Sequence, residues 1–157
     1  LGMVDGELAS DLSVRSEVAR IIRELKPEVV LGHDPWKRYR LHPDHRHAGW
    51  LAVDGAVAAR DPHFFPEHGL PHHRPEMLLL FEADEPDHGE DVTGFADHKL
   101  AALEAHQSQF ETTMYISEAD AGEERERFRR RIRDDLATAG RALGVADAEL
   151  YKRISTL

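Results

Sequence analysis

The sequence of 157 residues contains no cysteine. A chain without thiols cannot form a disulfide framework, a thiolate metal site or a thiol nucleophile. Any metal ion that this protein binds must therefore be held by histidine and carboxylate side chains.

Long apolar runs and an excess of basic charge are also missing. The apolar runs, such as residues 29–31 and 77–81, fall far short of the ~20 residues that cross a bilayer. There are 20 Lys and Arg against 30 Asp and Glu, which gives a formal net charge of −10. Such a surface is unsuited to a phosphate backbone, so neither nucleic acid nor a membrane span is expected. The sequence indicates a soluble, cytoplasmic protein.

The start of the chain has no signal peptide, and its first residue is Leu1 rather than a methionine. This beginning suggests that upstream polypeptide has been removed. With 157 residues and 41% apolar side chains, the chain can bury one core. We therefore expect a single domain over residues 1–157.

The order of hydrophobic patterns predicts an α/β fold. Helical spacing and strand-like runs alternate along the chain, with proline and glycine between them. The expected elements are a helix over 13–25, a buried strand over 28–32, a helix over 44–60, a long loop over 61–75, a buried strand over 77–82, an acidic loop over 84–91, and helices over 95–110 and 118–143, the last capped by Gly144.

Residues 40–49 carry the most distinctive chemistry in the chain. His42 and His45 stand three residues apart around Pro43 and Asp44, and proline favours the first position of a helix. Neutral imidazole suits Zn²⁺, and a neighbouring carboxylate can orient a ring. The same residues could equally form a plain polar helix entry, and their spacing alone does not decide between a metal or catalytic site and that structural role.

Three segments together resemble one known family. The first runs from His42 to Gly49 and is followed by an Ala-rich helix; the second is Lys99 to Gln109, which ends in His-Gln-Ser-Gln; the third is Ala148-Glu149-Leu150-Tyr151. In this order they resemble the PIG-L/LmbE-like zinc-dependent N-acetylglucosaminyl deacetylases. The resemblance implies a Rossmann-like three-layer sandwich with a mainly parallel sheet. The family's N-terminal Ala-His-Pro-Asp-Asp motif is absent, so we expect the first β-α unit, and two of three zinc ligands, to lie outside this chain.

The resemblance also implies roles for four residues. His45 would be a zinc ligand, His42 the imidazole that faces the substrate amide, and Asp44 a support for His42 or for the metal. Asp5 matches a family position that contacts sugar hydroxyls, although Asp5-Gly6 could equally be a simple turn. The family's general base is an Asp of the absent motif.

The implied activity is hydrolysis of an N-acyl amino sugar, or its glycoconjugate, by zinc-activated water. Family members commonly self-associate, so a homo-oligomer is among the implied partners. The alternative is a truncated, non-catalytic α/β module or remnant binding protein without a complete metal site.

Overall fold

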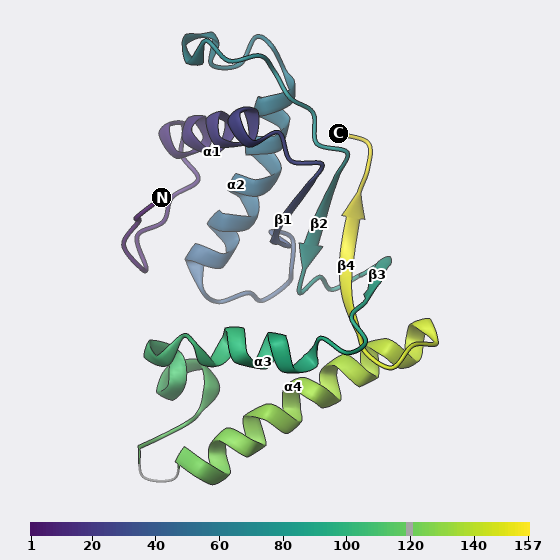
Figure 1. The fold of residues 1–157 in the computed structure, drawn as a ribbon. Helices are drawn as coiled ribbons and strands as arrows, with labels where there is room; N and C mark the ends of the chain where they lie inside the picture. Colours follow the sequence, from purple (N-terminus) through teal and green to yellow (C-terminus); the bar gives the residue numbers. More distant parts are fainter. Residues whose placement is uncertain (119–120) are drawn as a thin grey trace. The chain divides into compact units, whose positions relative to one another are not determined.

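The computed structural model describes residues 1–118 and 121–157. Along the chain lie α1 (Leu12–Leu25), β1 (Val29–His33), α2 (Pro43–Arg60), the short turn η1 (Pro66–His68), β2 (Met77–Phe81), β3 (His88–Asp91), α3 (Ala96–Glu104), the turns η2 (Gln107–Gln109) and η3 (Phe110–Met114), α4 (Ala121–Leu143) and β4 (Ala148–Ile154), as Figure 1 shows. The strands form a sheet in the order β1-β2-β4-β3. Since β1 pairs parallel and β4 antiparallel with β2, the α/β prediction is confirmed with a mixed sheet.

The chain divides into two compact units. The first comprises Leu1–His88 with Leu150–Leu157, and the second Gly89–Glu149. The expectation that residues 1–157 form a single domain stays a prediction.

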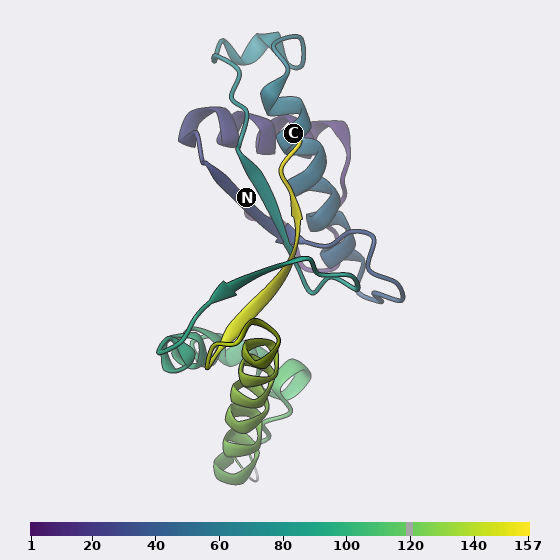
Figure 2. The same cartoon turned by 90° about the vertical axis from the view of Figure 1, so that its right-hand side faces the viewer.

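The core of the first unit lies between two helices and the middle of the sheet. Figure 2 shows α1 and α2 on the same side of β1 and β2. The fully buried side chains come from all of these layers and include Ala19, Ile22, Ala56, Ala58, Ala59, Leu78 and Leu80. The two helices approach closely, since a Cβ at Gly55 would lie 2.5 Å from Cγ1 of Val18. The small-residue face of α2 therefore brings it close to α1.

The prediction of a buried strand at residues 28–32 is wrong in one respect. β1 forms there, but Val29 is 39% exposed and Leu31 59% exposed. The reason is its place at the edge of the described sheet, where β2 is its only strand neighbour. By contrast, β2 is flanked on both sides and buries Leu78, Leu79 and Leu80 as predicted.

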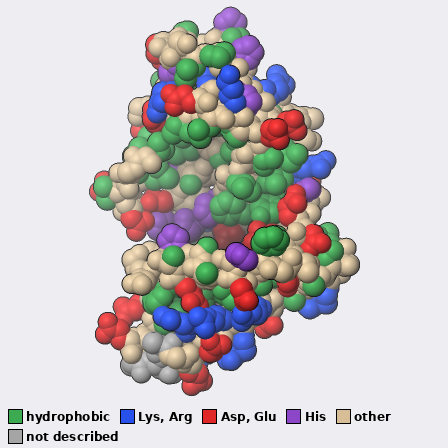
Figure 3. Space-filling view, viewed as in Figure 1, with side chains coloured by type: hydrophobic (Ala, Val, Ile, Leu, Met, Phe, Trp, Pro, Cys, Tyr) green, Lys and Arg blue, Asp and Glu red, His purple; other side chains and the backbone are tan. Residues whose placement is uncertain are grey.

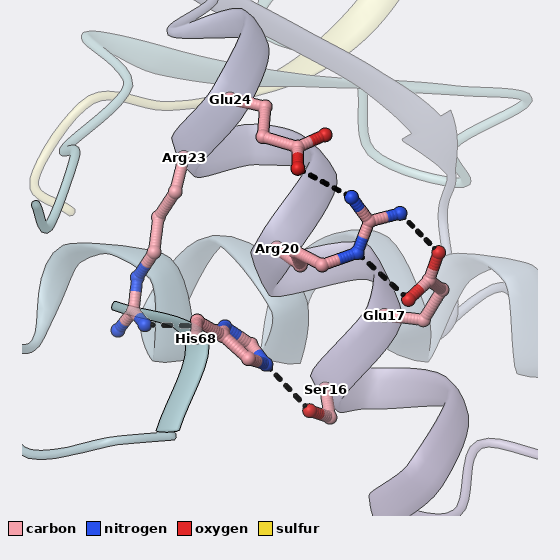
Figure 4. A network of polar contacts seen from close by, with 6 residues as sticks. All are labelled: Ser16, Glu17, Arg20, Arg23, Glu24 and His68. Atoms are coloured by element: carbon pink, nitrogen blue, oxygen red, sulfur yellow. Dashed lines mark hydrogen bonds and ion pairs between the residues drawn. The ribbon is translucent and has the colours of Figure 1, made fainter. Parts of the chain in front are cut away.

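A buried arginine ties the loop at residues 61–75 to α1. Arg23 is 2% exposed, and its guanidinium donates to the backbone carbonyls of Ala58, Ala59, Asp61, Phe64 and Phe65 at 2.8–3.3 Å. Figure 4 shows Arg23 beside His68, whose Nε2 lies 2.8 Å from Oγ of Ser16. These contacts hold η1 against the helix, although the loop has little regular structure of its own.

The second unit differs from the sequence prediction at several boundaries. The helix expected over 95–110 ends at Glu104 and continues as the turns η2 and η3, and the acidic loop over 84–91 ends in strand β3. The helix expected from 118 begins at Ala121, and residues 119–120 lie outside the described part. Gly144 has φ +75°, as its capping position requires.

Helices α3 and α4 pack through a small apolar cluster and two ion pairs, the more buried of which joins Arg129 to Glu104. The cluster contains Leu100, Met114, Ile116 and Phe128. Arg129 donates to both carboxylate oxygens of Glu104 at 2.6 and 2.8 Å. Figure 3 shows acidic and basic side chains intermixed over the outer face of α4, as expected for a solvated face. Among the described residues, no helix combines the length and apolarity that a membrane span needs.

Candidate active site

The site begins where two parallel strands end. His33 closes β1, its register partner is Phe81 at the end of β2, and Glu82 follows directly. The carboxyl ends of parallel strands meet at one edge of a sheet, where α/β proteins bind ligands. The loop after β1 leads from this edge to the beginning of α2, so His33 and Glu82 come close to the motif at residues 42–45.

The beginning of α2 follows from Pro43. Proline occupies the first helical position, as predicted, and His42 is the N-cap residue with extended backbone angles (φ −68°, ψ 120°). The His42 side chain makes no capping hydrogen bond and is 45% exposed. The His42 ring therefore takes no part in capping the helix.

The N-terminal segment packs on this helix end and brings Asp5 to the site. The amide N–H of Gly6 donates to Oδ2 of Asp44 at 2.7 Å, and Ser10 contacts Nδ1 of His47 through both its amide and its hydroxyl. As a result, Oδ1 of Asp5 lies 3.8 Å from Nε2 of His42. The role that Asp44 shows here is to anchor the N-terminal segment, and its Oδ1 is buried without a hydrogen-bond partner among the described residues.

Three imidazole rings form a continuous stack. The rings of His33 and His45 are 4.4 Å apart and 12° from parallel, and those of His42 and His45 are 4.9 Å apart at 27°. The ring of Phe81 also contacts the His33 ring, with 4.4 Å between their centres and a tilt of 59°. His45 is thus held between the imidazole expected to face substrate and a third one from the sheet.

Arg40 links the sheet edge to this stack, and its role is not visible in the local sequence. Its side chain is only 5% exposed, and Nη1 donates to Oε2 of Glu82 at 2.6 Å and to Nδ1 of His33 at 2.8 Å. Nε and Nη2 are buried and have no partner within the described residues. The one signal in the sequence is position, because residue 33 directly follows one predicted strand and residue 82 ends the other.

The charges in this cluster shift two pKa values. Burial, with the charges of His45 and Arg40, lowers the pKa of His33 to about 4. Burial by itself raises the pKa of Glu82, but the hydrogen bond and charge of Arg40 outweigh it and bring that pKa below its usual value. At neutral pH the cluster therefore holds a neutral His33, an ionised Glu82 and a guanidinium.

A metal ion fits one position of this cluster better than the others. One donor atom each of His33, His45 and Glu82 lie within 4.8 Å of one another. Two of the three, however, already receive hydrogen bonds from Arg40, whereas the exposed imidazole of His45 has no such competitor within the described residues. Since zinc takes three or four protein ligands, these residues fit it as part of a ligand set, through His45.

A shallow pocket lies beside the same sheet edge. It is lined by Asp34, Trp36, Arg38, Asp84, Glu85 and Lys152. Trp36 stands edge-on to Trp50 at 5.1 Å and remains 53% exposed. An exposed aromatic face beside polar groups is a surface on which a sugar ring can stack.

The fold and the histidines at its ligand-binding edge define an LmbE-like α/β protein. Over 109 residues, or 68% of its length, the chain is 36% identical to diacetylchitobiose deacetylase of Thermococcus kodakarensis. It is 38% identical over 79 residues to the 1D-myo-inositol 2-acetamido-2-deoxy-alpha-D-glucopyranoside deacetylase of Streptomyces avermitilis. The structure of N,N'-diacetylchitobiose deacetylase from Pyrococcus horikoshii matches 98% of the chain with a TM-score of 0.80 and 29% identity.

The chain belongs to the PIG-L/LmbE-like deacetylase family, in agreement with the resemblance of its three segments. No family model matches it. The chain spans 41% and 26% of the two curated relatives, and 55% of the Pyrococcus structure.

Proposed function

We propose that the protein hydrolyses the N-acyl group of an amino sugar or its glycoconjugate. The observation that carries this proposal is the convergence of His42, His45 and Asp5 at the beginning of α2, in a chain 36% identical to a diacetylchitobiose deacetylase. Water is added across the amide bond, so that the products are a carboxylate, acetate for an acetamido sugar, and a free amine.

His45 is the residue of this chain that would hold the metal. Zn²⁺ bound through its imidazole supplies Lewis-acid polarisation of the amide carbonyl and a water of lowered pKa. Zinc would need further ligands besides His45.

His42 is proposed to act on the amide itself. Its exposed ring lies against His45, so an N–H of His42 could donate to the carbonyl oxygen of an amide bound beside these two residues. A protonated His42 can stabilise negative charge on the carbonyl oxygen and then give its proton to the departing amine nitrogen. Asp5, whose Oδ1 lies 3.8 Å from Nε2 of His42, is positioned to accept a hydrogen bond from a sugar hydroxyl.

A second candidate is a non-catalytic sugar-binding module. The observation in its favour is that, of the three grouped donors His33, His45 and Glu82, only His45 has no hydrogen bond from Arg40. In that case the pocket beside Trp36 could bind a sugar without any hydrolysis.

The test is amine release by the intact protein from N-acetylglucosamine and N,N'-diacetylchitobiose, before and after chelation and with zinc restored. We expect hydrolysis that depends on the metal and that His42→Ala lowers by about 10²–10⁴-fold in kcat with zinc still bound. His72→Ala, an exposed histidine of the loop at 61–75, is the matched control and should retain full activity. Sugar binding without amine release from zinc-loaded protein would favour the second candidate.

A further inference from the structure

The position of Arg40 bears on which histidine can bind a metal. His33, His45 and Glu82 look like a ligand set by distance, because their donor atoms lie within 4.8 Å of one another. Nη1 of Arg40, however, lies within hydrogen-bond distance of two of them: 2.8 Å from Nδ1 of His33 and 2.6 Å from Oε2 of Glu82. A guanidinium therefore occupies the place between these two groups that a cation would take.

The hydrogen bond from Arg40 fixes the tautomer of His33. A guanidinium can only donate, so Nδ1 of His33 must accept, and the single proton of the neutral ring must be on Nε2. Nη1 carries two N–H bonds, which is enough for both acceptors, Nδ1 of His33 and Oε2 of Glu82, which lie 3.5 Å from each other.

A neutral imidazole has one lone pair in its plane, and metal binding needs that lone pair. In His33 the lone pair is used by Arg40 and the other nitrogen carries the proton. His33 can coordinate a metal only if its hydrogen bond to Arg40 is broken. The Arg40 side chain is 5% exposed and packed in place, so that loss is unfavourable.

We propose that Arg40 is a positioning residue that keeps His33 out of metal ligation and makes its ring a fixed support for His45. The proposal rests on the proposed function to the extent that His45 is the metal ligand. His33, clamped by Arg40 and Phe81, presents a flat face 4.4 Å from the His45 ring. It thereby restricts the orientation of that ring before any metal binds.

The first test needs no metal. Long-range ¹H–¹⁵N NMR of the metal-free intact protein at neutral pH reports which nitrogen of His33 carries the proton. We expect the Nε2–H tautomer in the wild type and a mixture of tautomers in Arg40→Met. A proton on Nδ1 in the wild type would overturn the proposal, whatever the protein's activity.

The second test compares the zinc affinity of two substitutions at His33. Phenylalanine retains a flat ring and has no nitrogen, whereas alanine removes both. If the ring is a support, His33→Ala weakens zinc binding by about 10-fold or more, as the loss of an outer contact does, and His33→Phe restores most of that affinity. If His33 is a ligand, the two variants are equally weak and the proposal is wrong.

His45→Ala separates the two proposals. It should weaken zinc binding by more than about 100-fold, beyond the usual effect of losing an outer contact. If it binds zinc like the wild type, the ligand assignment in the proposed function fails, while the tautomer of His33 still decides the role of its hydrogen bond to Arg40.

Discussion

Two arginines, Arg23 and Arg40, are buried in the first unit, and neither could be recognised from its neighbours in the sequence. Arg23 stands in an amphipathic helix among exposed charges, and Arg40 in a polar loop. Each is buried because distant segments surround it with acceptors: backbone carbonyls of residues 58–65 for Arg23, and His33 with Glu82 for Arg40. The motif residues His42, Asp44 and His45, by contrast, could be selected from local spacing and resemblance.

Replacing Arg23 tests how far the loop at 61–75 depends on it. Arg23→Met should lower the free energy of unfolding by about 2 kcal/mol or more, because each buried carbonyl left without a donor costs about 1–3 kcal/mol. The carbonyls of Ala59, Asp61 and Phe65 keep a backbone N–H donor, so the cost arises mainly at Ala58 and Phe64. Urea denaturation followed by circular dichroism measures the change.

The control is Arg20→Met in the same helix. Arg20 pairs with Glu17 and Glu24 on the exposed surface, as Figure 4 shows, and such pairs contribute little. Its loss should change stability much less than the loss of Arg23. Equal effects for the two variants would contradict the account of the buried guanidinium.

Helix α2 carries the site, and its position depends on one glycine. The sequence predicted its beginning at Pro43 and its small-residue face, since both follow from local preferences. The need for Gly49 could not be predicted, because it arises from close contact with another segment. A Cβ at this position would lie 2.6 Å from the carbonyl oxygen of His33 and 3.0 Å from Pro35. Glycine therefore lets the first turns of α2 lie against the end of β1, where His33 and His45 stack.

Gly49→Ala should separate the helix from the strand end. We expect a loss of about 1–3 kcal/mol in unfolding free energy from overpacking, together with weaker zinc binding as His45 moves away from His33. Chemical denaturation and zinc titration of the intact protein measure the two effects.

Gly122→Ala is the matched control. It lies in helix α4 with open space around the new Cβ, so it should stabilise the protein by up to about 1 kcal/mol and leave zinc affinity unchanged. If Gly49→Ala kept the stability and the zinc affinity of this control, the close approach of α2 to the end of β1 would be unimportant for both.

For the molecule as a whole, the fold class could be predicted from the sequence, whereas the pairing of the strands could not. Alternating helices and apolar runs gave an α/β protein, and the structure confirms that class. Strand β4 was not predicted, because its mixed residues acquire strand structure only by pairing with strands far away in the sequence, for example Ile154 with Leu78 of β2. The exposure of β1 was missed for the same reason, since the order of strands in a sheet depends on long-range contacts.

The candidate site also contains residues that could be predicted from the sequence and residues that could not. Resemblance pointed to His42, His45, Asp44 and Asp5, and the structure brings Asp5 to 3.8 Å from His42. The residues that surround these groups, His33, Arg40 and Glu82, come from three separate segments that meet only in the fold. Their contacts decide which imidazole is free for a metal.

The most direct test of the central claim is the location of zinc in crystals of the intact, zinc-loaded protein, determined by anomalous diffraction at the zinc edge. The account predicts an anomalous peak at ~2.0–2.1 Å from an imidazole nitrogen of His45, with Arg40 still hydrogen-bonded to His33. A peak bonded to His33 and Glu82, with Arg40 displaced, or a peak away from His45 would contradict it.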